Sequence, residues 1–247
     1  MSPDVQSKLA ELNQRFENET PHEILTHVLH DQPLGKLALI SSFGAESVVL
    51  LHLVAQIDRA TPVIFLDTEY LFEETLSYQK RVADALRLSN VVHVKPAEHV
   101  QGETQFNNSG MPVDTERCCF LRKTLPMKRA LADYAGSISG RKRYQSSARA
   151  LLPIFEWDMF TQSVKVNPVA KLSRNDIQDY IQRFDLPRHP LIDRGYTSIG
   201  CAPCTSSVSR HEDPRAGRWR GQAKTECGLH SVNGQLVREY EHTLHSI

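Results

Sequence analysis

The sequence predicts an α/β fold, a mostly parallel sheet with helices on both faces. Three short, continuous apolar segments support this prediction, at residues 37–40, 62–68 and 91–94, and helical patterns separate them. Continuous apolar strands that alternate with helices are typical of parallel sheets covered on both sides. Ligands of such sheets bind beyond the carboxyl ends of the strands. Residues 41–47 and 67–69, which follow the first two strands, are therefore expected to face a ligand.

The other regular elements follow from apolar periodicity and capping signals. Four helices are expected at residues 4–18, 22–30, 47–57 and 71–88. Two further strands are expected at residues 137–140 and 163–169. Ser173 and Asp176 have the spacing of a capping box, which predicts that a helix begins there and continues to about Phe184. A helix is also expected from Cys118, with a kink at Pro126.

Residues 41–47 have the character of a phosphate-binding turn. A turn from a strand into a helix points backbone N–H groups and hydroxyls at an anion, with the positive end of the helix behind them. The segment is not a P-loop, because it has no lysine to reach the outer phosphates. Taken alone it is equally well explained as an ordinary turn between a strand and a helix.

Four of the five cysteines form two close pairs. Cys118 and Cys119 are adjacent, and Cys201 and Cys204 form a Cys-x-x-Cys motif. Four thiols in this pattern can be the complete ligand set of an iron–sulfur cluster or of a tetrahedral zinc ion. Five unrelated buried thiols would seldom fall into it. The fifth cysteine, Cys227, lies outside the set and is therefore the candidate reactive thiol.

The charge pattern favours a compact anionic ligand. Lysine plus arginine and aspartate plus glutamate both number 29 in the 247 residues, so the net charge gives no sign of a nucleic-acid partner. Residues 117–129 contain five basic residues and no acidic one, and residues 141–149 contain four more. No apolar run is long enough to cross a membrane, and residues 1–4 do not resemble a signal peptide. A cytoplasmic protein with reduced thiols and no membrane partner is expected.

Two regions are expected along the chain. Residues 1–204 would form the α/β domain, with the candidate phosphate-binding turn and the paired cysteines; the family resemblance given below makes it the nucleotide- and cluster-binding domain. Beyond Cys204 the periodicity disappears and arginines become frequent, so residues 205–247 are expected to be a mobile tail that carries Cys227. A cysteine among cations has a stabilised thiolate and could close over a bound anion.

Several motifs together resemble one enzyme family. They are residues 41–47, Leu66-Asp67-Thr68, Cys118-Cys119-Phe120-Leu121-Arg122-Lys123, Gly140 with its basic run, residues 195–204, Arg215-Ala216-Gly217-Arg218-Trp219, and Glu226-Cys227-Gly228-Leu229-His230. The set resembles the thioredoxin-dependent assimilatory adenylyl-sulfate (APS) reductases, close relatives of the 3′-phosphoadenylyl-sulfate (PAPS) reductases. The match runs from about residue 37 to residue 230.

The resemblance implies an adenine-nucleotide hydrolase-like, Rossmann-like fold and the reduction of APS to sulfite and AMP, in sulfate assimilation and cysteine biosynthesis. It implies a 4Fe–4S cluster on Cys118, Cys119, Cys201 and Cys204. It also implies that Cys227 attacks the sulfate sulfur and becomes an S-sulfonate, which thioredoxin or glutaredoxin then resolves. A homo-oligomer is expected on the same ground.

The resemblance further implies a set of substrate contacts. Adenosine would lie between the loop residues Ser41, Ser42, Phe43 and Gly44 and the strand residue Leu66. The phosphosulfate and sulfonate oxygens would be surrounded by Lys123, Lys142, Arg143, Arg215, Arg218 and His230.

Three positions depart from the family pattern. Glu69 stands where glycine is frequent, Lys142 where arginine is usual, and Tyr144 where an acid is common. Lysine keeps the positive charge but lacks the bidentate geometry of arginine, which leaves the role of Lys142 open.

Three alternatives stay open at the level of sequence. The nearest is a cluster-containing PAPS reductase, or an enzyme that accepts both nucleotides. An ATP pyrophosphatase of related fold is less compatible, because the loop lacks the second glycine and the aspartate of Ser-Gly-Gly-x-Asp-Ser. The third is a zinc-stapled nucleotide-binding protein in which Cys227 is inert.

Overall fold

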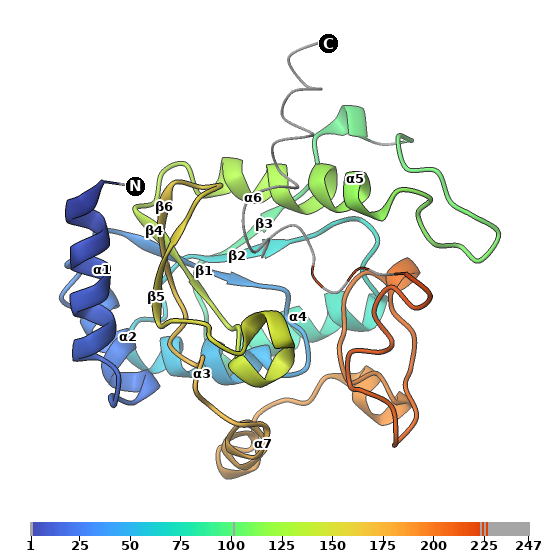
Figure 1. The fold of residues 1–247 in the computed structure, drawn as a ribbon. Coiled ribbons are helices and arrows are strands. Elements are labelled where there is room, and N and C mark those ends of the chain that lie inside the picture. Colours follow the sequence, from blue (N-terminus) through green and yellow to red (C-terminus); the bar gives the residue numbers. More distant parts are fainter. Residues whose placement is uncertain (1, 101, 223, 225, 227–247) are drawn as a thin grey trace.

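A six-stranded sheet forms the centre of the protein (Figure 1). The structure is a computed structural model that describes residues 2–100, 102–222, 224 and 226. The strands are β1 (Leu37–Ser41), β2 (Val63–Leu66), β3 (Val91–Val94), β4 (Gly136–Ser139), β5 (Phe155–Asp158) and β6 (Ser163–Val166). Their order is β3-β2-β1-β4-β6-β5, and all neighbouring pairs are parallel except β5 with β6. The predicted mostly parallel α/β fold is confirmed.

Seven α-helices surround the sheet in the described part of the chain. They are α1 (Pro3–Arg15), α2 (Pro21–Leu29), α3 (Ser47–Ile57), α4 (Glu73–Leu86), α5 (Thr115–Cys119), α6 (Leu125–Ala130) and α7 (Arg174–Arg183). The predicted capping box at Ser173 is present, with both reciprocal hydrogen bonds to Asp176. A π-helical turn at Phe120–Thr124 directly precedes Pro126, which lies in the first turn of α6.

The strands β1 and β2 are buried on both faces, which explains why they are continuous apolar runs in the sequence. The edge strand β3 is partly exposed. Leu37 and Leu39 of β1 belong to the core that α2, α3 and α4 cover. Ala38, between them, points to the opposite face and packs with Met127 and Leu131 near α6. Figure 1 shows the same arrangement, with α6 on one side of the sheet and α3 and α4 on the other.

The sheet places two loops next to each other. β1 pairs with β2 on one side and with β4 on the other, so the direction of the crossovers changes between β1 and β4. This is the switch point at which ligands of open α/β sheets bind. Residues 41–47 follow β1 and the basic run after Gly140 follows β4, so the two loops meet at the same edge.

The edge strand β5 does not follow from the apolar pattern. It is short and half polar, and its backbone is capped by the amide of Asn13, which donates to the Phe155 carbonyl at 2.7 Å and accepts from the Phe155 N–H at 3.0 Å. A side chain from α1 thus covers part of an otherwise exposed sheet edge. No helix among the described residues has the length and apolar character that a membrane crossing requires.

Candidate active site

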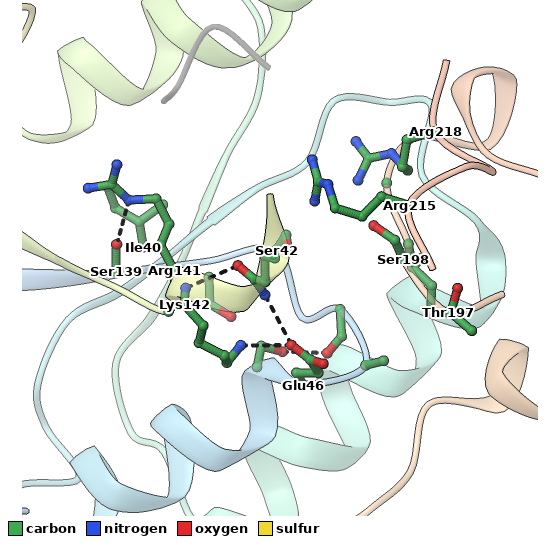
Figure 2. Close-up of a pocket in the computed structure, with 18 of the residues that line it drawn as sticks. Ile40, Ser42, Glu46, Ser139, Arg141, Lys142, Thr197, Ser198, Arg215 and Arg218 are labelled. Atoms are coloured by element: carbon green, nitrogen blue, oxygen red, sulfur yellow. Dashed lines mark hydrogen bonds and ion pairs between the residues drawn. The ribbon is translucent and has the colours of Figure 1, made fainter. Parts of the chain in front are cut away.

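A cavity of about 260 Å³ lies at the carboxyl ends of β1, β2 and β4 (Figure 2). Three segments line it, namely the loop after β1, the basic run after β4, and residues 197–201 with residues 213–219. The strand pattern predicted the loop after β1 at this edge, and the family resemblance predicted the basic run close to the substrate. The third brings the Cys-x-x-Cys motif to the same cavity, because Cys201 is one of the lining residues.

The buried ring of Phe43 anchors the loop after β1 in the core. The Ser41 hydroxyl accepts a hydrogen bond from the Phe43 N–H at 3.1 Å, and Phe43 has a left-handed φ of 47°. Its ring is fully buried and contacts Phe65 edge to face, with ring centroids 5.3 Å apart. Phe43 therefore shapes the loop from the core and does not line the cavity, whereas Ser41, Ser42 and Gly44 do. Leu66 also lines it, as expected.

Glu46, which the sequence did not single out, organises one wall. Its carboxylate lies 2.9 Å from the Lys142 ammonium and accepts hydrogen bonds from the Tyr144 hydroxyl at 2.8 Å and the Gln145 amide at 3.0 Å. Burial alone would raise the pKa of Glu46, but the charge of Lys142 and the hydrogen bonds from Lys142, Tyr144 and Gln145 together outweigh it and hold that pKa below its usual range. Figure 2 shows the Lys142 and Glu46 side chains pointing toward one another.

This network explains one departure from the family pattern. An acid at position 144 would place a second carboxylate beside Glu46, whereas the Tyr144 hydroxyl donates to it. Lys142 lines the cavity as predicted, but its charge is balanced inside the protein.

The arginines of the basic run differ in position from the expectation. The Arg143 guanidinium donates to the Leu152 carbonyl at 2.9 Å and does not line the cavity. Arg141 and Arg149 do line it. Arg141 donates to the Ser139 hydroxyl at 3.2 Å (Figure 2) and forms an ion pair with Glu156. The sequence does not show that Arg141 and Arg149, and not Arg143, line the cavity. Which side chains of a turn point into a cavity depends on the backbone conformation of that turn.

Hydrogen bonds hold the Cys-x-x-Cys loop between the residues that follow β2 and the later segment that contains Trp219. The Thr68 hydroxyl lies 3.1 Å from the Cys201 sulfur, and the Ala202 N–H donates to the Tyr70 carbonyl at 2.7 Å. On the other side the Trp219 N–H donates to the Cys204 carbonyl at 3.0 Å, and the Trp219 ring is almost fully buried. The described residues beyond 204 are thus hydrogen-bonded to the α/β body as far as residue 222.

The four paired cysteines come together as free thiols. Cys119, Cys201 and Cys204 are buried and Cys118 is half-buried. Burial and the three neighbouring thiols raise the pKa of Cys204 to about 12. Burial would likewise raise the pKa of Cys201, but the charges of Lys123 and Arg218, with hydrogen bonds to Thr68 and Lys123, together outweigh it and lower that pKa. Lys123, a predicted substrate contact, lines the cavity beside Cys201.

Arg215 and Arg218 come from the segment that faces Glu46 across the cavity (Figure 2). The Arg218 guanidinium lies over the Trp219 ring, 4.4 Å from its centroid. It fits there because Gly200 has no side chain: a Cβ atom at that position would lie 2.5 Å from Nη2 of Arg218. Arg218 forms no ion pair with a carboxylate among the described residues, and its Nε atom has no hydrogen-bond partner there.

Two predicted site residues, Cys227 and His230, lie outside the described residues, so their roles stay predictions. The residue before the cysteine, Glu226, is described and lines the cavity.

The fold and the cavity define an α/β protein with a pocket that is lined by several cations and bordered by Cys201 of the Cys-x-x-Cys motif. Residues 36–207 match the model of the phosphoadenosine phosphosulfate reductase domain. The chain belongs to this family, and the predicted membership in an enzyme family of sulfonucleotide reductases is confirmed.

Curated relatives agree with this assignment. The chain is 41% identical to an adenosine 5′-phosphosulfate reductase of Mesorhizobium japonicum, over 92% of this chain and 88% of that protein. It is 37% identical to a phosphoadenosine 5′-phosphosulfate reductase of Gloeobacter violaceus, over 92% of this chain and 95% of that protein. Among solved structures, the PAPS reductase of Candida auris in a phosphate complex has the same fold, with a TM-score of 0.68 at 24% identity over 84% of this chain and 98% of that chain.

Proposed function

We propose that this protein reduces APS to sulfite and AMP. The observation that carries the proposal is that one cavity joins the serine-rich loop after β1, the cations Arg215, Arg218 and Lys123, and Cys201. A nucleotide with a reactive anionic end needs these three features side by side. The relative from Mesorhizobium japonicum, named as an APS reductase, supports the substrate.

The chemistry needs one reactive thiol and one external reductant. The Cys227 thiolate attacks the sulfur of APS, an S–S bond forms, and the bond between sulfur and the phosphate oxygen breaks, so that AMP leaves with the electron pair. A thiolate of thioredoxin or glutaredoxin then attacks the Cys227 sulfur and releases sulfite. Its second thiol resolves the mixed disulfide, which supplies the two electrons.

The cavity residues divide between binding and charge stabilisation. The hydroxyls of Ser41 and Ser42 and the backbone at Gly44 and Leu66 would contact adenosine. Arg218, Arg215 and Lys123, with His230 from the tail, would stabilise the charge that develops on the phosphate as AMP leaves. Lys142 would mainly stabilise the cavity wall, through its ion pair with Glu46.

The four paired cysteines fit a 4Fe–4S cluster. The donor set is purely thiolate, and the thiols are close enough for Cys118, Cys119 and Cys201 to raise the pKa of Cys204. Among the described residues, no group of three or more candidate ligands is spaced to hold a metal ion. Four thiolates are also a ligand set that zinc accepts, so metal analysis separates the two metals. When bound, the cluster would supply a fixed local charge beside Lys123.

Metal analysis tests the cluster. Anaerobically purified protein should contain about four iron and four sulfide per chain and absorb visible light. Cys118→Ser and Cys201→Ser should each lose iron and colour, whereas Cys227→Ser should retain both. Full occupancy by zinc in an active enzyme would contradict the assignment.

A thioredoxin-coupled sulfite assay tests the reaction. We expect sulfite from APS with a higher kcat/KM than from PAPS, because the paired cysteines resemble the APS-using branch of the family. The relative from Gloeobacter violaceus, named for PAPS, supports dual specificity as the second candidate. Equal constants for the two nucleotides would establish that candidate, and no sulfite from either would refute the proposed reaction.

The wider setting follows from the same proposal. Sulfite production would place the enzyme in sulfate assimilation and cysteine biosynthesis, in the cytoplasm and as a homo-oligomer. Residues 1–204 would bind the nucleotide and the cluster, and residues 205–247 would carry Cys227.

A further inference from the structure

Glu46 brings a carboxylate to the loop after β1. In the described part of the chain the cavity is lined by three carboxylates, of which Asp213 and Glu226 come from the segment after the Cys-x-x-Cys motif. Glu46 instead directly precedes α3, where the helix dipole favours a negative charge. The start of this helix, which could otherwise attract a phosphate group, thus already has an anion of the protein beside it.

The Glu46 carboxylate has capacity for a further hydrogen-bond donor. A carboxylate has about four acceptor positions, two on each oxygen. Oε2 accepts from the Lys142 ammonium at 2.9 Å and from the Gln145 amide at 3.0 Å, whereas Oε1 accepts from the Tyr144 hydroxyl at 2.8 Å. Among these contacts Oε1 therefore has room for a second donor. Because the Glu46 side chain lines the cavity and is 20% exposed, a hydroxyl group of a ligand can reach it.

Charge is distributed unevenly across the cavity, which orients a nucleotide. Arg215 and Arg218 lie on the side of the Cys-x-x-Cys loop, and Glu46 lies on the other side (Figure 2). The anionic phosphosulfate end of a sulfonucleotide is attracted to the arginines. Its adenosine end then lies beside the loop after β1, where Glu46 is the nearest carboxylate in the chain.

The buried cations near Glu46 are already balanced. Lys142, Arg141 and Arg149 are each at most 9% exposed, and each forms an ion pair with a carboxylate. Arg174 also lines the cavity, but it is exposed, so solvent screens its charge. A phosphate group on the ribose would therefore meet the Glu46 carboxylate without a buried cation to compensate for its charge.

We propose that Glu46 is a specificity-determining residue, which accepts a hydrogen bond from a ribose hydroxyl and disfavours a phosphate group at that position. This role rests on the proposed function, because it requires a nucleotide whose reactive end lies at Arg218. APS and PAPS differ by one phosphate group on the ribose 3′ oxygen. A hydroxyl donates to a carboxylate, whereas a phosphate is repelled by it. Dinucleotide-binding folds discriminate in the same way, with a carboxylate for the free ribose and an arginine for the phosphorylated one.

Calorimetric binding of two unreactive nucleotides tests this role without turnover. AMP and adenosine 3′,5′-bisphosphate differ by the single phosphate group, so a general loss of stability cancels in the ratio of their Kd values. The wild type should bind AMP at least about tenfold more tightly than the bisphosphate. Glu46→Gln removes the negative charge with little change in shape and releases Lys142, so this preference should fall by about tenfold. An unchanged preference, or equal Kd values in the wild type, would overturn the proposal.

Glu156→Gln is the matched control. Glu156 also forms an ion pair with a cation of the cavity wall, Arg141, but it does not itself line the cavity. This variant should keep the preference of the wild type for AMP. An equal fall in Glu46→Gln and Glu156→Gln would show that the charge of the whole wall matters, and would overturn the specific role of Glu46.

A second variant serves if Glu46→Gln folds poorly with Lys142 unbalanced. Lys142→Met/Glu46→Gln removes both charges of the pair, so the preference for AMP should fall by only about threefold, because no cation is released to bind the added phosphate. A preference equal to that of the wild type in this double variant would also overturn the proposal.

Sulfite assays with APS and PAPS separate this role from the function on which it rests. The ratio of kcat/KM for APS to that for PAPS should fall about tenfold in Glu46→Gln, as the Kd ratio does. If the wild type forms sulfite from neither nucleotide, the proposed reaction fails, whereas the Kd ratios still decide the role of Glu46.

Discussion

Lys142 and Arg141 on one wall of the cavity differ from Arg218 on the other wall in whether an internal carboxylate balances their charge. On the strand side, Lys142 and Arg141 are buried and paired with Glu46 and Glu156 of the same domain. On the cysteine side, Arg218 lies over Trp219 with no carboxylate partner among the described residues. A buried cation with an internal partner is part of the wall, whereas one without a partner is available to an incoming anion. The number of cations in a motif therefore does not show how many of them bind substrate.

Arg218 should show the largest catalytic effect. Arg218→Gln removes the cation that faces the leaving phosphate, so kcat/KM for sulfite formation from APS should fall by about 10²-fold or more. The thermal unfolding midpoint should stay near that of the wild type, since no internal ion pair is lost. A large loss of stability instead would show that Arg218 belongs to the wall.

Lys142 should behave in the opposite way. Lys142→Met leaves the Glu46 carboxylate buried without its cation, which should cost about 3 kcal/mol of unfolding free energy in a denaturant titration. The double variant Lys142→Met/Glu46→Gln should recover much of that loss, because no uncompensated charge is left. If the single variant keeps its stability and instead loses affinity for AMP, Lys142 is a substrate cation and the two walls do not differ.

A substitution at Gly200 tests whether the position of the Arg218 guanidinium matters for catalysis. The Cβ atom of Gly200→Ala would meet the Arg218 guanidinium at 2.5 Å and displace it from the Trp219 ring. We expect roughly a tenfold loss of kcat/KM, since the cation is moved and not removed. Iron content should be unchanged. An alanine variant with wild-type kinetics would mean that the position of this guanidinium is unimportant.

The smallest expected effect is a pH dependence of stability that comes from His189. His189 lies between α7 and the cysteine loop; its Nδ1 accepts from the Leu191 N–H at 3.2 Å, and its Nε2 lies 3.1 Å from the Thr75 hydroxyl. Burial lowers its pKa to about 4 from 6.5. Between these values the unfolded chain binds a proton that the folded chain does not. The stability is therefore complete above pH 6.5 and falls by roughly 1 kcal/mol per pH unit toward pH 4.

His189→Asn provides the check by calorimetry between pH 5 and 7. Asparagine can still accept the Leu191 N–H at the start of the short helix Pro190–Arg194, but it does not titrate. Its unfolding midpoint should depend less on pH than that of the wild type. Parallel pH profiles would show that His189 is not the titrating group.

The sequence was informative where one residue's environment follows from its neighbours in the chain. The runs at β1 and β2 are apolar on both faces, so their burial in a parallel sheet was predictable, and the Ser173 cap was predictable from its spacing. The predicted strand β3 is present and parallel to β2, but Val92 and His93 are exposed at this edge of the sheet. The edge strand β5 was not predictable, because it is half polar and is completed by Asn13 from a distant helix.

The same limit applies to the site. The cavity lining includes Ser41, Ser42, Gly44 and Leu66, which lie at or just after the ends of β1 and β2, and Cys201 of the spaced motif. Their roles toward a substrate or a cluster stay predictions. Glu46 was missed because its role depends on Lys142 and Tyr144, almost a hundred residues later. Arg143 and Arg141 exchange places for a similar reason, since the direction of a side chain in a turn depends on the backbone around it.

The most direct test of the proposed chemistry is mass spectrometry of the protein mixed with APS in the absence of a reductant. The peptide that contains Cys227 should gain one sulfonate group, and reduced thioredoxin should release it as sulfite. Cys227→Ser should retain iron and bind AMP but carry no sulfonate. Sulfite formation at the wild-type rate by Cys227→Ser, with no adduct on the wild-type peptide, would contradict the mechanism.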